Sequence, residues 1–192
     1  MQITAKQMFS TVQVPAYTLE RIIELWAGRE SISLLDITNL EIPVNDIIWA
    51  VTQFFDAKTN RLLSADYAES VLHLWTAEYP DDDRPELTIK AARDFANGKI
   101  SREQLDNAWY LARGAARGAA RDATIDRITG DEIAASAAGD AMVSAMVSAL
   151  SASGAVDVVA DWAAMVSGSE TEEPIQWAIL RQYILKMEAA HA

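Results

Sequence analysis

The sequence predicts an all-α fold, and three observations support this prediction. Apolar residues recur at intervals of three and four along most of the chain, which is the spacing of a helix face. No alternating apolar and polar run is bounded by turn residues, as the strands of a hairpin would be. A run of small residues, LDNAWYLARGAARGAARDA at 105–123, repeats every four positions. We expect a single-domain multi-helix bundle of about eight helices, with an Ala/Gly/Ser-rich, tightly packed second half.

Several segments of the first half carry helix signals. Residues 18–28 begin with a capping threonine and end in glycine, which together mark both ends of a helix. Residues 31–43 are compatible with a short helix and a loop. An apolar helix follows at 45–55, opened by the polar residue at 45 or 46. Residues 60–79 form the clearest amphipathic helix, with one apolar side made of Leu63, Tyr67, Val71, Leu74 and Trp75.

The remaining helices are marked by their ends. Pro80 ends the amphipathic helix, and Pro85 suits the first turn of the next one, which closes at Asn97-Gly98. Ser101 and Gln104 have the spacing of a capping box, so another helix begins there. A final helix opens at residues 171–174. We expect one domain over residues 1–192, with a soft seam near residue 100 between a Leu/Ile/Trp-rich half and an Ala-rich half.

The run of small residues predicts close helix packing. At about 100° per residue, Gly114 and Gly118 fall on roughly the opposite side from a stripe that contains Leu105, Trp109 and Ala112. Glycine in an exposed helix costs about 1 kcal/mol relative to alanine. We therefore expect another backbone to approach the helix at Gly114 and Gly118, in the same chain or in a second copy.

Composition excludes several kinds of chemistry. The chain contains no cysteine and two histidines, His73 and His191, which removes disulfides, thiolate nucleophiles and most zinc sites. The common phosphate-binding and zinc-protease motifs are absent. His73 lies one turn after Glu69, a spacing that suits a general base but is also common on helix surfaces. We expect no catalytic, cofactor-binding or metal-binding residues, no cofactor and no enzymatic activity.

The net charge of −12 indicates the class of partner. Residues 123–192 hold ten acids and three bases, so the charge is concentrated toward the C-terminal third. An acidic surface disfavours direct nucleic-acid binding, because phosphate contacts need Lys and Arg, and it favours a protein with a basic surface. Solubility alone explains the charge equally well. The expected partner-binding acids lie at helix starts and loops: Asp81, Asp82, Asp83, Glu170, Glu172 and Glu173.

Two further patterns concern the second half and the location of the protein. Arg113, Arg117 and Arg121 share one spacing, and we expect them to pair with acids of the same chain rather than with phosphate. The longest charge-free run, at 141–156, is shorter than the roughly 20 apolar residues of a membrane-spanning helix. The N-terminus lacks a signal-peptide pattern. We expect a cytoplasmic protein that does not bind membranes.

Seven segments resemble those of a known family: EIPVNDIIW at 41–49, RLL at 61–63, AESVL at 68–72, YPDDDRP at 79–85, IKAAR at 89–93, NGKI at 97–100 and ILRQYI at 179–184. The family is an all-helical group of immunity proteins of bacterial polymorphic toxin systems, and it is also widespread in phages. The resemblance covers roughly residues 35–186 and is most specific at 79–99.

This resemblance implies a non-enzymatic protein that neutralises a toxin or a defence protein by occlusion. The phage relatives leave an alternative open, in which a phage-encoded anti-defence protein acts as an acidic mimic of nucleic acid. The sequence does not identify the target, the oligomeric state or the interface.

Overall fold

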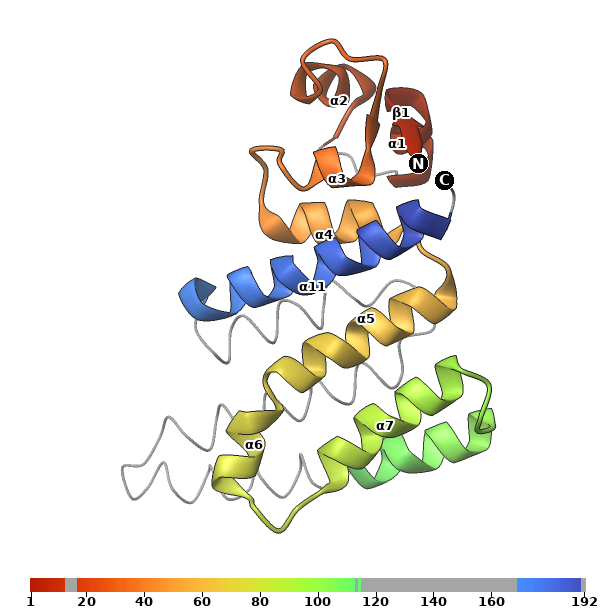
Figure 1. The fold of residues 1–192 in the computed structure, drawn as a ribbon, viewed down its shortest axis with the longest axis vertical. Coiled ribbons are helices and arrows are strands. Elements are labelled where there is room, and N and C mark those ends of the chain that lie inside the picture. Colours follow the sequence, from red (N-terminus) through yellow and green to blue (C-terminus); the bar gives the residue numbers. More distant parts are fainter. Residues whose placement is uncertain (13–16, 113, 115–168, 191–192) are drawn as a thin grey trace.

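The computed structural model describes residues 1–12, 17–112, 114 and 169–190. It confirms the all-α fold, with a two-stranded sheet added in the described part. Most of the described helices form a stack that runs from the N-terminal elements through α4, α11 and α5 to α7 (Figure 1). The elements are β1 (Gln2–Thr4), α1 (Ala5–Val12), α2 (Leu19–Leu25), β2 (Ser31–Ser33), α3 (Leu34–Ile37), α4 (Val44–Thr52), α5 (Ala57–Ser70), α6 (Leu72–Glu78), α7 (Arg84–Ala96) and α11 (Ser169–Ala190). A further helix occupies residues 102–112.

The first strand pairs with a segment about 30 residues later. β1 and β2 are antiparallel, and Ile3 lies opposite Ile32 with both side chains almost fully buried. In each strand the central residue is buried and its two neighbours are more exposed. Three residues are too few to show the period-two alternation of a strand in the sequence. The sequence was compatible with a short helix within residues 31–43, but it did not indicate the strand that precedes this helix.

Side-chain caps confirm two of the predicted helix starts. Thr18 Oγ1 accepts a hydrogen bond from the Arg21 backbone N–H (3.2 Å), which satisfies a free donor in the first turn of α2. Ser101 and Gln104 form the expected capping box. The Gln104 N–H donates to Ser101 Oγ (3.2 Å), and the Ser101 N–H donates to Gln104 Oε1 (2.8 Å).

Two helix boundaries differ from the prediction. α4 begins at Val44 after Pro43, whose φ of −53° already suits a helix, rather than after a polar cap at 45 or 46. The helix predicted over 60–79 is divided at Val71, which has φ −104° and ψ 0° and separates α5 from α6. Val71 is fully buried. A bend of one residue leaves the apolar spacing nearly unchanged, so the sequence pattern does not reveal it.

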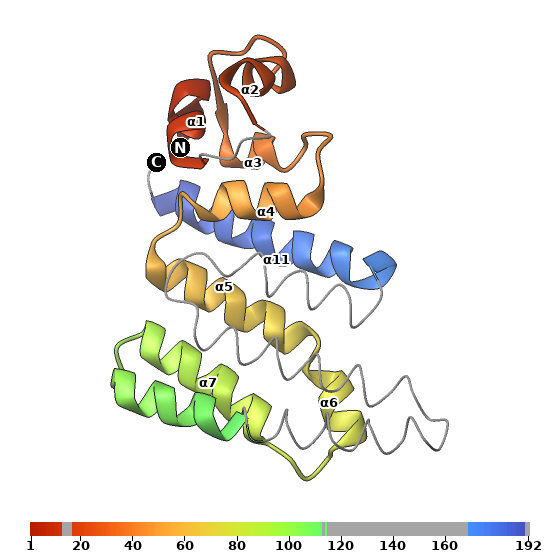
Figure 2. The same cartoon turned by 180° about the vertical axis from the view of Figure 1, so that it is seen from behind.

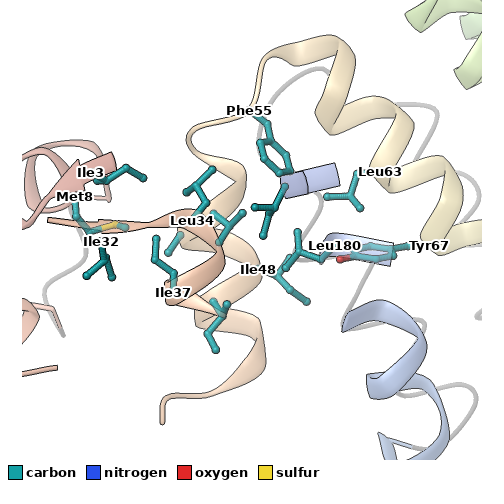
Figure 3. Packing of buried hydrophobic residues seen from close by; sticks show 14 of the residues in the cluster. Ile3, Met8, Ile32, Leu34, Ile37, Ile48, Phe55, Leu63, Tyr67 and Leu180 are labelled. Atoms are coloured by element: carbon teal, nitrogen blue, oxygen red, sulfur yellow. The ribbon is translucent and has the colours of Figure 1, made fainter. Parts of the chain in front are cut away.

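The C-terminal helix packs into the centre of the stack. In both views α11 lies between α4 and α5 (Figure 2). Leu180 of α11, Ile48 of α4 and Tyr67 of α5 belong to one buried apolar cluster (Figure 3). The Tyr67 hydroxyl also donates to Gln176 O (3.4 Å). Fully burying one such apolar side chain stabilises a fold by roughly 1.5–3 kcal/mol, so α11 contributes directly to the core.

α7 and the helix at 102–112 run side by side after a tight turn at Gly98, where φ is 70°. Thr88 Oγ1 of α7 donates to Ala108 O (3.3 Å). Leu105 and Ala112 are buried, as the predicted stripe requires. The rest of the Ala-rich segment, including Gly118 and the three evenly spaced arginines, lies outside the described residues. None of the described helices is long and apolar enough to cross a membrane.

Candidate protein-binding site

The loop at residues 79–83, between α6 and α7, is held against the core by a tryptophan. Trp75 of α6 is 1% exposed, and its Nε1–H donates to Asp82 O (2.9 Å). The Trp75 ring packs against the Tyr79 ring with 4.5 Å between the centroids. The Asp82 N–H also donates to Tyr79 O (3.1 Å). These contacts fix the backbone that carries the three aspartates, around a hollow lined by residues 78–84.

The three aspartates of this loop have different environments. Asp82 is half-buried and accepts hydrogen bonds from Arg84 Nε (2.7 Å) and Nη2 (2.5 Å). The Arg84 hydrogen bonds hold the pKa of Asp82 below its usual range. Asp81 and Asp83 are exposed, and Asp83 directly precedes α7, where the helix dipole favours negative charge. Asp81 and Asp83 can therefore meet a partner, whereas the Asp82 carboxylate is already bound to Arg84.

Three large apolar side chains are exposed on the two helices that follow this loop. Leu87 of α7 is 49% exposed, and Tyr110 and Leu111 of the helix at 102–112 are 71% and 59% exposed. Single exposed apolar residues are ordinary, but a group of them beside charged residues is typical of an interaction site. No sequence pattern pointed to a partner-binding role for these three residues. The sequence feature that could have identified Tyr110 and Leu111 as exposed is their position off the helix face that contains Leu105 and Ala112.

Two contacts bring the end of the helix at 102–112 beside the start of α7. One is the Thr88–Ala108 hydrogen bond described above. The other is at Gly114, where an added Cβ atom would lie 3.9 Å from Arg84 Nη1. Because Arg84 directly follows the aspartate loop, this end of the helix lies near the loop, and we group the exposed residues of the loop and of the two helices. We call this the acidic–aromatic surface, and its members are Asp81, Asp83, Leu87, Tyr110 and Leu111.

The predicted glycine packing has a partial outcome. Gly114 is exposed, and among the described residues the atom nearest to its missing Cβ belongs to the flexible end of the Arg84 side chain. Gly118 lies outside the described residues. The close approach of another helix at Gly114 and Gly118 therefore stays a prediction.

The second predicted acidic cluster lies on the C-terminal helix. Glu170, Glu172 and Glu173 fall in the first two turns of α11, which begins at Ser169. The structure describes the side chains of this helix from Ile175 onward. The partner-binding role of these three glutamates stays a prediction.

Glu69, the carboxylate one turn before His73, is bound to another residue. It accepts hydrogen bonds from Arg93 Nη1 (2.9 Å) and Nη2 (2.6 Å). His73 is exposed, and its Nδ1 lies 3.0 Å from Ser70 O. Within the described residues, no group of three or more His, Cys, Asp or Glu side chains could hold a metal ion. This arrangement gives no support to the general-base interpretation of His73.

A polar cluster that the sequence did not predict joins three helices. Arg93 of α7 contacts Asp66 of α5 (2.5 Å) as well as Glu69, and Tyr183 of α11 donates to Asp66 Oδ2 (2.7 Å). The Arg93 hydrogen bonds lower the pKa of Glu69, and burial together with the Asp66 hydrogen bond raises the pKa of Tyr183. The members lie on three helices far apart in sequence, so no local pattern in the sequence brings them together.

Comparison with known proteins adds one match. A family model described as "Imm-5 like putative immunity protein" matches residues 58–179. This range begins in α5, contains the whole acidic–aromatic surface and ends within α11. It covers more than half of the 192 residues. No curated protein and no solved structure matches the chain.

Proposed function

The chain belongs to the Imm-5 like immunity family, and from this premise we propose that it is a non-enzymatic protein that neutralises a toxin or a defence protein by occlusion. Family membership gives the immunity-type role. The acidic–aromatic surface supports the finer proposal, because Tyr110 and Leu111 are exposed on a helix whose end reaches Arg84, and Asp81 and Asp83 are exposed on the loop just before Arg84. Buried aromatic anchors surrounded by polar residues are the usual energetic centre of a protein interface.

The two kinds of residue contribute to binding in different ways. Tyr110 has a large, rigid ring that gains contact area at little cost in conformational entropy, so it serves as an anchor. Asp81 and Asp83 carry charge, which speeds the encounter with a basic partner and sets the orientation of the complex. The net charge of −12 adds to this long-range attraction. When the toxin or defence protein binds here, its own basic surface is covered and cannot act. No catalytic step is required.

A second proposal remains for the same charge. A phage-encoded anti-defence protein with a net charge of −12 would occupy a nucleic-acid-binding site by imitating phosphate. In that case DNA or RNA competes with this protein for the partner, and carboxylates spread over the whole surface carry the binding. In the occlusion proposal Tyr110 carries a large share of the affinity. Removing its ring should therefore weaken binding under the occlusion proposal and leave it nearly unchanged under the mimicry proposal.

The experiment begins with affinity capture of the partner from the native host and its identification. Binding is then measured with wild type, Tyr110→Ala and Asp81→Asn/Asp83→Asn. Two matched controls lie outside the range of the family model. Phe9→Ala removes an aromatic ring that is 43% exposed, and Glu20→Gln/Glu30→Gln removes two exposed acids.

We expect Tyr110→Ala to weaken binding by roughly 30-fold, which corresponds to about 2 kcal/mol, while the controls bind like wild type. Equal affinity of Tyr110→Ala and Phe9→Ala would show that the acidic–aromatic surface is not the interface. Loss of binding on adding nucleic acid, together with full binding by Tyr110→Ala, would favour mimicry.

A further inference from the structure

One turn of α5 contains buried polar atoms that have no hydrogen-bond partner in the described part of the chain. They are Asn60 Oδ1, Arg61 Nε and Ser64 Oγ. The three residues are 5%, 5% and 0% exposed. At about 100° per residue they fall on one face of α5. Buried polar groups are nearly always hydrogen-bonded, so the two unpaired donors, Arg61 Nε–H and the Ser64 hydroxyl, point to an acceptor that binds there.

Arg61 is the charged member of this turn. Its guanidinium carbon lies 4.6 Å from the centre of the Phe95 ring. None of the ion pairs among the described residues includes Arg61, although the chain contains 28 acidic residues. A buried charge normally has a counter-charge, because its transfer out of water is otherwise unfavourable. Arg61 therefore has the environment of a cation whose anion comes from outside the described chain.

The surroundings of Arg61 favour an anion further. Burial lowers the pKa of Arg61, and the positive charge of nearby Arg102 lowers it as well. Arg102 itself donates to Asp106 (2.8 Å), so that carboxylate is already used. Of the three guanidinium nitrogens of Arg61, only Nε is among the fully enclosed atoms without a partner.

We infer that Arg61 is the centre of a binding site for one oxyanion group, a carboxylate or a phosphate. The planar guanidinium presents two parallel N–H donors, which match two oxygens of such a group. Ser64 supplies a hydroxyl donor on the same face, whereas Asn60 Oδ1 is an acceptor and does not contact the anion. The site lies in the first half of α5, away from α6 and the aspartate loop, so it is independent of the proposed protein-binding surface.

Thermal unfolding at constant ionic strength tests this site, with sodium phosphate or sodium acetate replacing sodium chloride. The proteins are wild type, Arg61→Met, and the control Arg21→Met, which removes an exposed arginine of α2 that pairs with Glu24. We expect phosphate or acetate to raise the midpoint of wild type and Arg21→Met by a few degrees, in a saturable way, because a ligand stabilises the state that binds it. Arg61→Met should lack the saturable rise.

If phosphate raises the unfolding midpoint and acetate does not, the ligand of the site is a phosphate group. The opposite result identifies it as a carboxylate. Absence of any rise in wild type, or an equal rise in Arg61→Met, overturns the inference. If Arg61→Met does not fold, nuclear magnetic resonance of arginine-labelled wild type replaces it, with Arg61→Gln used for assignment. The enclosed Arg61 Nε–H signal should shift with phosphate or acetate and not with chloride. A signal that stays in place in all three salts contradicts the site.

Discussion

Tyr183 of the C-terminal helix donates its hydroxyl hydrogen to Asp66 of α5 across 117 positions of sequence, with 2.7 Å between the oxygens. The other Asp66 oxygen, Oδ1, accepts a hydrogen bond from Arg93 Nη2 of α7 (2.5 Å). One carboxylate therefore connects α5, α7 and α11. Since α11 also lies between α4 and α5, this contact helps to fix the C-terminal helix at the centre of the stack.

Replacing Tyr183 with phenylalanine tests this connection. The substitution keeps the ring and removes a hydrogen bond to a charged acceptor, so we expect it to lower the free energy of unfolding by about 1–2 kcal/mol in urea. Tyr110→Phe is the control, because the Tyr110 side chain is 71% exposed and its hydroxyl group has access to water. If both variants unfold at the same urea concentration as wild type, the Tyr183–Asp66 bond does not stabilise α11.

Arg93→Met should change how stability depends on acid. Arg93 lowers the pKa of Glu69 in the folded state below its value of 4.5 in a free side chain. This interaction is complete above pH 4.5 and is lost as the pH falls through the lower folded pKa. At pH 7 we expect Arg93→Met to cost about 1–3 kcal/mol, because two neighbouring carboxylates lose their shared cation.

The difference between Arg93→Met and wild type should shrink as the pH falls below 4.5, since the unpaired Glu69 carboxylate then becomes neutral. Urea unfolding at several pH values provides the measurement. A difference that is constant from pH 7 to pH 3 would mean that Arg93 acts through packing and not through its charge.

Substitutions at Gly114 and Gly118 test by their effect on stability whether another helix approaches each position. If the Arg84 end alone faces Gly114, at 3.9 Å from an added Cβ, Gly114→Ala should be neutral or stabilise the helix by up to about 1 kcal/mol, whereas a loss of stability would reveal the predicted approach of another helix. Gly118→Leu should destabilise by about 1–3 kcal/mol if another helix approaches that face. Thermal melts give both values. An unchanged melt for Gly118→Leu would remove the predicted helix contact there.

His73→Ala tests whether the protein has a catalytic function. His73 is exposed, and Glu69, the carboxylate one turn earlier, is bound by Arg93. We expect the variant to fold and to protect cells as wild type does, in an assay that measures growth in the presence of the captured toxin. Loss of protection by a folded His73→Ala protein would make an enzymatic mechanism the leading hypothesis.

Local signals in the sequence predicted the described fold well where one residue determines a helix end. Thr18 caps α2, Pro85 lies in the first turn of α7, and Ser101 with Gln104 opens the next helix, as their spacing indicates. The break at Val71 was missed because a single non-helical residue barely shifts the apolar period. The strands were missed because their pairing partners are distant and each strand has three residues.

The candidate site was predictable only in part for the same reason. The aspartate loop is visible as a run of charge, but the sequence does not reveal that Arg84 binds the middle aspartate and leaves Asp81 and Asp83 free. Tyr110 is visible as an aromatic residue off the buried stripe. The approach of its helix to the loop depends on how α7 pairs with that helix, which the local sequence does not reveal.

Association kinetics with the captured partner test most directly whether the acidic surface recognises a basic protein. Raising the salt from low concentration to about 0.5 M shortens the Debye length to a few Å, so we expect association to slow much more than dissociation. Asp81→Asn/Asp83→Asn should show a slower rate and a weaker salt dependence. Neutralising the second cluster, with Glu170, Glu172 and Glu173 changed to glutamine, tests the remaining predicted acids in the same way. An association rate of wild type that does not change with salt would contradict electrostatic recognition and assign the net charge of −12 to solubility.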